Sequence, residues 1–193
     1  GTTVESFRQT GERVQVSLSD GAIEEFDLLI GADGVHSRVR ALAFGEEDQF
    51  TRFMGYYTAA FILPRKPLEH VAIDALYTLN EPGRQVAVYP IRGDRLATFF
   101  VFKSNRTLHE FSDETAASEL RFKYSGMDWV VPTLLEWCDR SSLYFDEVSQ
   151  IELPHWSKGR VTLVGDACQC VSLMAGQGAS LAMTGAYVLA EEL

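Results

Sequence analysis

Apolar and β-branched residues occur in short runs separated by turn-forming residues along most of the chain. Such runs, bounded by Gly, Asn, Asp and Pro, predict β-strands joined by tight turns. Near the start, runs at residues 3–7 and 13–18 lie on either side of Gln9-Thr10-Gly11, and Ser19-Asp20-Gly21 follows as a second turn. We therefore expect a β-meander that leads into the unbroken apolar run Leu28-Leu29-Ile30, which is typical of a strand covered on both faces.

The pattern changes between about residues 51 and 153. Aromatic and β-branched residues fill four runs, at residues 56–63, 74–79, 85–89 and 96–102. Their separators, Asn80-Glu81-Pro82-Gly83 and Arg92-Gly93-Asp94, are hairpin-type turns and predict an antiparallel sheet. Ser112 is expected to open a helix that runs through Phe122. Helical spacing predicts a second helix at Val131, Leu134, Leu135 and Cys138, so helices should cover one face of the sheet.

The last segment returns to the pattern of the first. Val161-Thr162-Leu163-Val164 predicts a short buried strand, and Gly165-Asp166 follows at its carboxyl end. From residue 178 to 193, apolar residues four apart lie beside a stripe of small residues, which predicts a helix that packs closely on a sheet. The changes of pattern near residues 50 and 155 are the expected domain boundaries.

The amino-acid composition excludes several classes of protein. With 46% hydrophobic and 23% charged residues among 193, the chain can build a hydrophobic core and is neither a disordered tail nor a fibre. Its 17 Lys and Arg against 27 Asp and Glu give a net charge of −10, which argues against nucleic acid as a partner. No apolar run approaches the roughly 20 residues of a membrane span. A soluble protein without a membrane span is therefore expected.

The cysteine and histidine residues add two expectations. Cys138, Cys168 and Cys170 are odd in number and lack CxxC spacing, which favours a reducing compartment, so a cytoplasmic protein is expected. The four histidines have no partner at ligand spacing, so no metal site is expected. Two thiols one residue apart are poorly placed for an unstrained disulfide, and we expect Cys168 and Cys170 to be buried in packing instead of forming a redox pair.

Two acidic residues occupy matching places. Asp33 follows the apolar run ending at Ile30, and Asp166 follows the strand at 161–164, each at the end where open α/β sheets bind ligands. A carboxylate there can accept hydrogen bonds from sugar or ribityl hydroxyls, or it can simply cap a turn or helix. The run Gly176-Gln177-Gly178-Ala179 lets a backbone approach a planar ligand closely and points helix N–H groups at it. Its glycine spacing is not the dinucleotide fingerprint.

Together these motifs resemble those of a known family. The stretch DLLIGADGVHSRVR at residues 27–40 resembles the DG motif of the FAD-dependent aromatic hydroxylases, the para-hydroxybenzoate hydroxylase-like flavoprotein monooxygenases. The stretch GRVTLVGDA at residues 159–167, continuing to residues 176–179, resembles their GD motif. The two matches stand in the right order with a sheet-rich segment of the right size between them, so the resemblance covers essentially the whole chain.

The resemblance implies a cofactor and the residues that hold it. Asp166 would bind the ribityl part of FAD, and the backbone at residues 176–178 would face the pyrimidine edge of the isoalloxazine. Arg38 would belong to the motif involved in both FAD and NAD(P)H contacts, although a salt bridge that holds the short helix is an equal alternative. The implied cofactor-binding residues are Asp33, Gly34, Arg38, Gly165, Asp166, Gly176, Gln177, Gly178 and Ala179. No catalytic acid or base and no metal ligand is named.

The implied fold class is mixed α+β and α/β. A partial FAD-binding, Rossmann-like domain is expected at residues 1–50 and 154–193. An inserted antiparallel β-sheet domain at residues 51–153, covered by helices, would bind the substrate. Since the family's Gly-x-Gly-x-x-Gly turn has no counterpart here, the chain is expected to be a fragment without that N-terminal segment, and inactive on its own. Gln169 replaces the usual His, and the loop at 171–173 lacks the proline often found there.

The implied reaction uses FAD, NAD(P)H and dioxygen to hydroxylate an aromatic or polyketide-like small molecule. Halogenases, epoxidases and prenyl-chain reductases share the same motifs, so another flavin-dependent reaction stays open. A third alternative is a non-catalytic folded domain that does not retain FAD. The residues leave the choice between NADH and NADPH, the identity of the substrate and the oligomeric state open.

Overall fold

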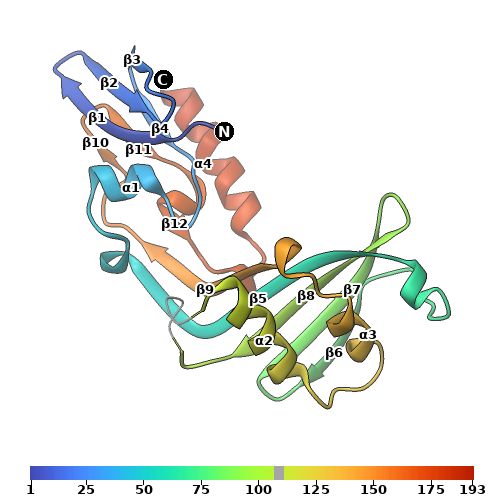
Figure 1. Ribbon diagram of the computed structural model, residues 1–193. Helices are drawn as coiled ribbons and strands as arrows, with labels where there is room; N and C mark the ends of the chain where they lie inside the picture. Colours follow the sequence, from blue (N-terminus) through green and yellow to red (C-terminus); the bar gives the residue numbers. More distant parts are fainter. Residues whose placement is uncertain (107–110) are drawn as a thin grey trace. The chain divides into compact units, whose positions relative to one another are not determined.

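The computed structural model describes residues 1–106 and 111–193, and these form two compact units (Figure 1). The first unit comprises Gly1–Met54 and Ser149–Leu193, and the second comprises Gly55–Val148. The fold is mixed α/β with antiparallel sheets, as the pattern of the sequence predicts. The second unit is an insertion within the first, since both ends of the chain belong to the first unit.

The first unit opens with the predicted meander. Strands β1 (Val4–Thr10), β2 (Arg13–Leu18) and β3 (Ile23–Phe26) form a sheet in the order β1-β2-β3. Both pairs are antiparallel, with Thr10 opposite Arg13 at the first turn. The turn residues Gly11 and Gly21 have φ of +67° and +85°, a conformation that glycine adopts without steric cost.

A second sheet in this unit joins the two ends of the sequence. Strand β4 (Leu29–Gly31) pairs in parallel with β11 (Val161–Leu163), and β10 (Ser157–Lys158) pairs antiparallel with β11. Leu29 lies opposite Val161 and Gly31 opposite Leu163. The expectation that the apolar run is covered on both faces is wrong for Ile30, which is 42% exposed. Alternate strand residues point to opposite faces, and the small core of this unit lies on the face of Leu29 and not on that of Ile30.

The other elements of the first unit are short, with one exception. Helix α1 (Arg38–Ala43) follows β4, and Ser37 is its N-cap, whose side chain accepts a hydrogen bond from the Arg40 N–H. Single turns η1 (Glu47–Gln49), η5 (Gly165–Ala167) and η6 (Leu173–Ala175) and strand β12 (Gln169–Cys170) fill the loops. The predicted C-terminal helix is α4 (Gly178–Glu192). Its small-residue stripe does approach the sheet, because a Cβ built on Gly185 would lie 3.5 Å from Val164 Cγ2.

The second unit is built on an antiparallel sheet in the order β9-β5-β8-β7-β6. The strands are β5 (Thr51–Pro64), β6 (Tyr77–Glu81), β7 (Arg84–Ile91), β8 (Arg95–Lys103) and β9 (Tyr144–Glu152), and a 3-10 turn, η2 (Lys66–Leu68), follows β5. The two predicted hairpin turns connect β6 to β7 and β7 to β8. Strand β6 begins at Tyr77, three residues after the start of the predicted run, and β9 was not predicted. The end of β9, from Ser149 on, belongs to the first unit, and there Gln169 of β12 lies opposite Glu152.

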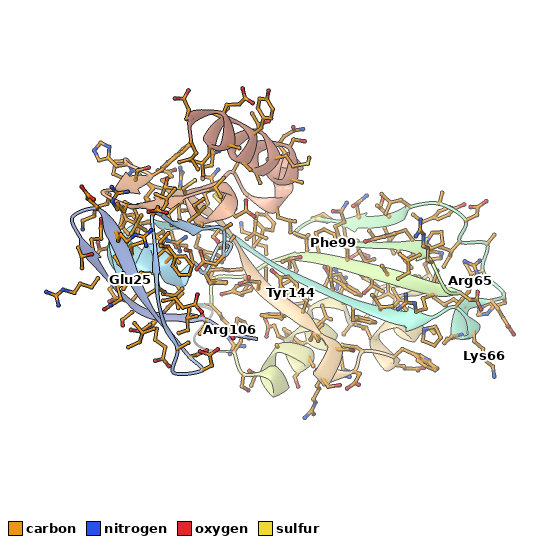
Figure 2. The ribbon with its side chains drawn as sticks, turned by 90° about the horizontal axis from the view of Figure 1, so that it is seen from above. Glu25, Arg65, Lys66, Phe99, Arg106 and Tyr144 are labelled. Atoms are coloured by element: carbon orange, nitrogen blue, oxygen red, sulfur yellow. The ribbon has the colours of Figure 1, made fainter. Side chains whose placement is uncertain are left out.

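Helices α2 (Asp113–Tyr124) and α3 (Val131–Glu136) cover one face of this sheet, and η4 (Arg140–Ser142) leads into β9. Ser112 caps α2 as predicted, and its side chain accepts a hydrogen bond from the Thr115 N–H. The packed face carries the large core side chains Tyr57, Phe61, Phe100, Phe102, Leu120, Tyr124 and Leu134. The alternate strand residues, on the other face, include Thr58, Ala60, Ala87, Ala97, Phe99 and Val101. Figure 2 labels Phe99 on β8 and Tyr144 at the start of β9.

Residues 1–106 and 111–193 contain neither a membrane-spanning helix nor a metal-binding cluster. None of the helices in this range has the length and hydropathy required to cross a membrane. Nor does this range contain three or more His, Cys, Asp or Glu side chains placed to hold a metal ion.

Candidate functional site

The two motifs lie at the same edge of one sheet. Strands β4 and β11 are parallel neighbours, and the backbone N–H of Val164 donates to the Gly31 carbonyl at 2.9 Å. Asp33 and Asp166 follow the carboxyl ends of these two strands, the end at which open α/β sheets bind ligands. The sequence therefore correctly placed two distant stretches side by side, within the first unit (Figure 1).

The Asp33 carboxylate holds the start of α1. Its Oδ1 accepts a hydrogen bond from the Ser37 hydroxyl at 2.5 Å, and its Oδ2 accepts one from the Val39 N–H at 3.0 Å. This is the capping role that the sequence left open as an alternative. Asp33 is still exposed, and a carboxylate has further acceptor sites, so capping and ligand binding are compatible. Gly34, with φ of +81°, makes the turn between the strand and the helix.

Arg38 lies on the exposed side of α1. Its Nη2 donates to the backbone carbonyl of Glu5 on β1 at 3.3 Å. This contact ties the helix to the meander through a carbonyl oxygen and not through the carboxylate that the salt-bridge alternative requires. The guanidinium remains exposed to solvent.

The second motif brings a carboxylate against the start of α4. Gly165 is buried with φ of +66°, and a Cβ built on it would lie 3.2 Å from the Cβ of Ala182, so α4 packs almost directly on the motif backbone. A Cβ built on Gly178, the first residue of α4, would lie 3.6 Å from Asp166 Oδ1. The half-buried Asp166 carboxylate thus lies beside the positive end of the helix dipole, which stabilises negative charge.

The N-terminus of α4 has free hydrogen-bond donors. Its N-cap, Gln177, makes no side-chain capping bond, and the preceding Gly176 has φ of +64°. The first N–H groups of a helix have no partner within the helix, so those of residues 178–180 are available to an acceptor. Gly176, Gln177 and Ala179 are exposed and Gly178 is half-buried. The Asp166 carboxylate, a hydrogen-bond acceptor, therefore lies next to the backbone N–H donors at the start of α4.

The loop that leads to this helix holds one strained residue. Ser172 has φ of +85°, a region that non-glycine residues rarely adopt, and it is only 6% exposed. Its hydroxyl accepts a hydrogen bond from the Met174 N–H at 3.3 Å, which helps to hold the conformation. Strain of this kind persists only where the surroundings fix the backbone, and it concentrates at functional sites.

The cysteines of the second motif are buried free thiols. Burial raises the pKa of the Cys168 thiol to about 11, and it also raises the pKa of Cys170. Cys168 Sγ lies 3.4 Å from the Gly165 carbonyl, and Cys170 Sγ lies 3.7 Å from that of Ser149. Both thiols stay protonated at neutral pH, which fits packing and not redox chemistry.

Sequence reasoning missed one residue that connects the two motifs. Arg40 is completely buried, and its Nη2 donates to the Val35 carbonyl at 2.6 Å. Its Nη1 donates to the Ala167 carbonyl at 3.1 Å, across 127 residues of sequence. Nothing in the local sequence distinguishes Arg40 from the exposed Arg38 two positions earlier, because its burial depends on the pairing of β4 with β11.

Comparison with known proteins shows the family. Over residues 1–193, its whole length, the chain matches the family described as FAD binding domain. The chain belongs to this family.

Relatives and solved structures agree with this assignment. The chain is 38% identical over 195 residues to the uncharacterized protein Rv1260 of Mycobacterium tuberculosis, a match that covers 99% of this chain and 51% of the relative. It is 34% identical over 194 residues to a flavin-dependent monooxygenase of an unknown prokaryotic organism, covering 98% and 49%. The crystal structure of tetracycline destructase Tet(55) is similar with a TM-score of 0.86 and 30% identity, covering 99% and 51%. The chain spans about half the length of the curated relatives it matches.

Proposed function

We propose that the first unit forms the flavin-facing part of an FAD site in a flavin-dependent monooxygenase. The observation that carries this proposal is the Asp166 carboxylate beside the N-terminus of α4, at the sheet edge shared with the first motif. Family membership supplies FAD as the cofactor, and a monooxygenase among the relatives supports the reaction class.

The residues present fit a polyhydroxylated, electron-accepting ligand. No hydrogen bond to Asp166 occurs within residues 1–106 and 111–193, so its oxygens are available to ribityl hydroxyls. A Cβ at Gly178 would make only ordinary contact with Asp166 Oδ1, at 3.6 Å, and nothing lies within 4 Å of a Cβ built on Gly176, so the backbone of this turn leaves room for a flat ring. The free N–H groups of α4 would stabilise negative charge at the pyrimidine edge of that ring. Asp33, Gly34 and Arg38, which follow the neighbouring strand β4, complete the proposed set of FAD-binding residues. Gly165 belongs to the set because its lack of a side chain lets α4 pack closely.

When bound, FAD would supply the redox chemistry, with NAD(P)H as reductant and dioxygen as the source of the oxygen atom. The protein's own contribution is to hold and orient the ring and to place donors where negative charge develops. No acid or base of the chain is assigned a proton-transfer step. The tetracycline destructase among the similar structures supports an aromatic or polyketide-like small molecule as substrate.

The inserted sheet, within residues 51–153, is the proposed substrate-binding domain. Its helix-covered face is filled by the aromatic core, so the opposite face is the one that we propose meets the substrate. That face alternates small residues with larger ones: Ala60 lies opposite Phe99, and Phe99 lies opposite Ala87. Such a surface suits a flat apolar molecule.

The direct test is FAD binding by the full-length protein with Asp166→Ala and Asp166→Asn. Loss of hydrogen bonds to a charged acceptor should weaken FAD affinity by about tenfold to a hundredfold in Asp166→Ala, with a smaller loss in Asp166→Asn. Quenching of flavin fluorescence measures the dissociation constant. Asp27→Ala is the matched control, since this acid lies just before β4 and pairs with Arg13 at 3.1 Å. Equal affinity in the wild type and both Asp166 variants, or no FAD binding at all, would overturn the proposal.

A further inference from the structure

Strand β6 forms a free edge of the sheet in the second unit. It is the last strand in the order β12-β9-β5-β8-β7-β6, so among residues 1–106 and 111–193 it pairs only with β7 (Figure 1). The outer edge of such a strand presents a row of unpaired N–H and C=O groups, which is a template for pairing with another strand.

The register of the β6-β7 hairpin identifies the free backbone groups. Glu81 lies opposite Arg84 across a two-residue turn, and the pairing continues without a shift back to Tyr77. The pair that closes such a turn exchanges two hydrogen bonds, and along an antiparallel ladder these pairs alternate with non-hydrogen-bonded ones. Thr78 and Asn80 therefore belong to non-hydrogen-bonded pairs, and their N–H and C=O groups point away from β7.

This edge lacks the features that usually discourage pairing. Edge strands are commonly protected by bulges, proline, lysine or uncompensated charges. Strand β6 has a regular register and the sequence YTLNE, without proline or lysine. Its one charged residue, Glu81, is neutralised by Arg84, whose Nη2 and Nε donate to Glu81 Oε2 at 2.5 and 2.8 Å. By contrast, the edge strand β3 of the first unit carries the adjacent acids Glu24 and Glu25.

Exposed apolar side chains lie at the start of the same strand. Leu76, just before β6, is 63% exposed, and Tyr77 and Trp129 are 38% and 41% exposed. The rings of Tyr77 and Trp129 are in contact, with centroids 6.5 Å apart. Trp129 has φ of +62°, which a bulky residue rarely adopts, so a strained backbone holds this ring at the surface. Apolar groups that are exposed together mark an interaction surface.

We propose that β6 pairs with β6 of a second copy of this chain, antiparallel about a two-fold axis at Leu79. Thr78 then lies opposite the second copy's Asn80, and its Asn80 lies opposite the second copy's Thr78. Each of these pairs exchanges two hydrogen bonds through the backbone groups that β7 leaves free. The inference is independent of the proposed function.

The strand sequence is complementary to itself in this register, which is why the occupant is a second copy. The exposed Leu76 falls opposite Pro82, and Tyr77 falls opposite Glu81, so no like charges are opposed. The antiparallel direction also brings Asp74, which precedes β6, toward the second copy's Arg84 at the other end of the strand. A closed, two-fold contact of this kind uses the same patch on both copies.

The association should be weak because the pairing is short. Stable interfaces bury about 1,200–2,000 Å² in total, and a five-residue strand with its apolar flank lies at the low end of that range. We therefore expect a dissociation constant of about 1–100 μM. Sedimentation velocity of the full-length protein across about 1–300 μM covers this range.

Thr78→Pro and Thr78→Lys test the edge directly in the full-length protein. Proline removes an N–H that points to solvent and leaves the ladder with β7 intact, and lysine places like charges near the two-fold axis. Each variant should raise the dissociation constant by at least about tenfold. Thr10→Lys is the matched control, because Thr10 is an exposed residue of another edge strand, β1, and its replacement should leave the dimer unchanged.

Cross-linking tests the register. Residues opposite each other in a hydrogen-bonded antiparallel pair have Cα atoms about 5.5 Å apart, within reach of a disulfide. Under mild oxidation, a mixture of the Thr78→Cys and Asn80→Cys proteins should form linked dimers faster than either protein alone. The native cysteines Cys138, Cys168 and Cys170 are buried, so they should not compete.

A protein that stays monomeric up to the highest concentration would overturn the inference, and so would a dimer that Thr78→Lys leaves intact. If Thr78→Pro does not fold by circular dichroism, Thr78→Lys decides alone. Faster cross-linking of either cysteine variant with itself than with the other would contradict the two-fold axis at Leu79.

Discussion

Gly31 lies directly against Leu163: a Cβ built on Gly31 would fall 2.5 Å from Leu163 Cδ2 and 2.8 Å from Val39 Cβ. The two residues are opposite each other in the parallel pair that joins the motifs. No L side chain fits at this point unless its neighbours move. The close approach of the strands therefore depends on glycine here for reasons of space and not of backbone conformation.

Gly31→Ala should destabilise the first unit by about 1–3 kcal/mol, the cost of overpacking a filled core. Urea denaturation gives the change in the free energy of unfolding. Gly185→Ala is the matched control, because a Cβ at Gly185 would make only ordinary contacts, the nearest at 3.5 Å from Val164 Cγ2. In the middle of α4 that change should be neutral or stabilise by roughly 0.5–1 kcal/mol. An equal loss in both variants would contradict the steric account.

Ser37→Ala should cost about 1–2 kcal/mol, since this buried hydroxyl accepts from the Arg40 N–H and donates to Asp33 Oδ1. Ser112→Ala, which removes the exposed cap of α2, should cost less. Because Ser37 and Asp33 share one hydrogen bond, the loss in a double variant Ser37→Ala with Asp33→Ala should be smaller than the sum of the two single losses. Strict additivity would show that the two side chains act independently.

Cys168 should make stability fall at high pH. Burial raises the pKa of its thiol to about 11 in the folded protein, above its ordinary value of about 9. A raised folded pKa gives stability that is complete below the unfolded pKa and is lost as pH rises through the folded one. The loss should amount to roughly 2–3 kcal/mol between pH 9 and pH 11. Urea midpoints across this range for the wild type and Cys168→Ala measure it, and parallel curves would refute it.

Alkylation provides a second measurement of the same thiol. In the native protein, Cys168 should react with iodoacetamide with a pH midpoint near 11. In urea the midpoint should return to the ordinary value of about 9. Mass spectrometry of the modified peptide follows both rates, and a native midpoint near that of the unfolded protein would contradict burial of the thiol.

Tyr124→Phe should destabilise the second unit by about 1–3 kcal/mol. The phenol is fully buried and lies 2.7 Å from both the Gln85 and the Val101 carbonyl oxygens. Burial raises the pKa of Tyr124 far above its ordinary value, so the group remains a donor at all practical pH values. Tyr77→Phe is the control, because its hydroxyl bonds the exposed Asp74 and its removal should cost less than about 0.5 kcal/mol. Differential scanning calorimetry of the Tyr124→Phe and Tyr77→Phe variants measures the two losses of stability.

Sequence reasoning succeeded where the signal is local. Ser112 caps α2, and the glycine-containing turns at 80–83 and 92–94 join antiparallel strands, because each of these depends on a few adjacent residues. The placement of Asp33 and Asp166 at one sheet edge also followed, since parallel strands carry their carboxyl ends together.

It failed where structure depends on distant partners. Strand β9 was missed because Asp146 and Glu147 interrupt its apolar alternation, and it becomes a strand by pairing within the sheet. Ile30 is exposed and Arg40 is buried because the pairing of β4 with β11 decides which side of the sheet is covered. The capping of α1 by Asp33 was an open alternative, because the same acid at the same position suits a ligand or a helix.

The parallel pairing of β4 with β11 has a consequence for the order of folding. A ribosome releases Gly31 long before it has made Leu163, and everything from Gly55 to Val148 emerges in between. A contact of such high sequence separation is slow to form. The second unit has a core of its own, so we expect it to fold first during translation. Its collapse draws the flanking segments together and shortens the search that the nascent chain must complete before its two ends meet.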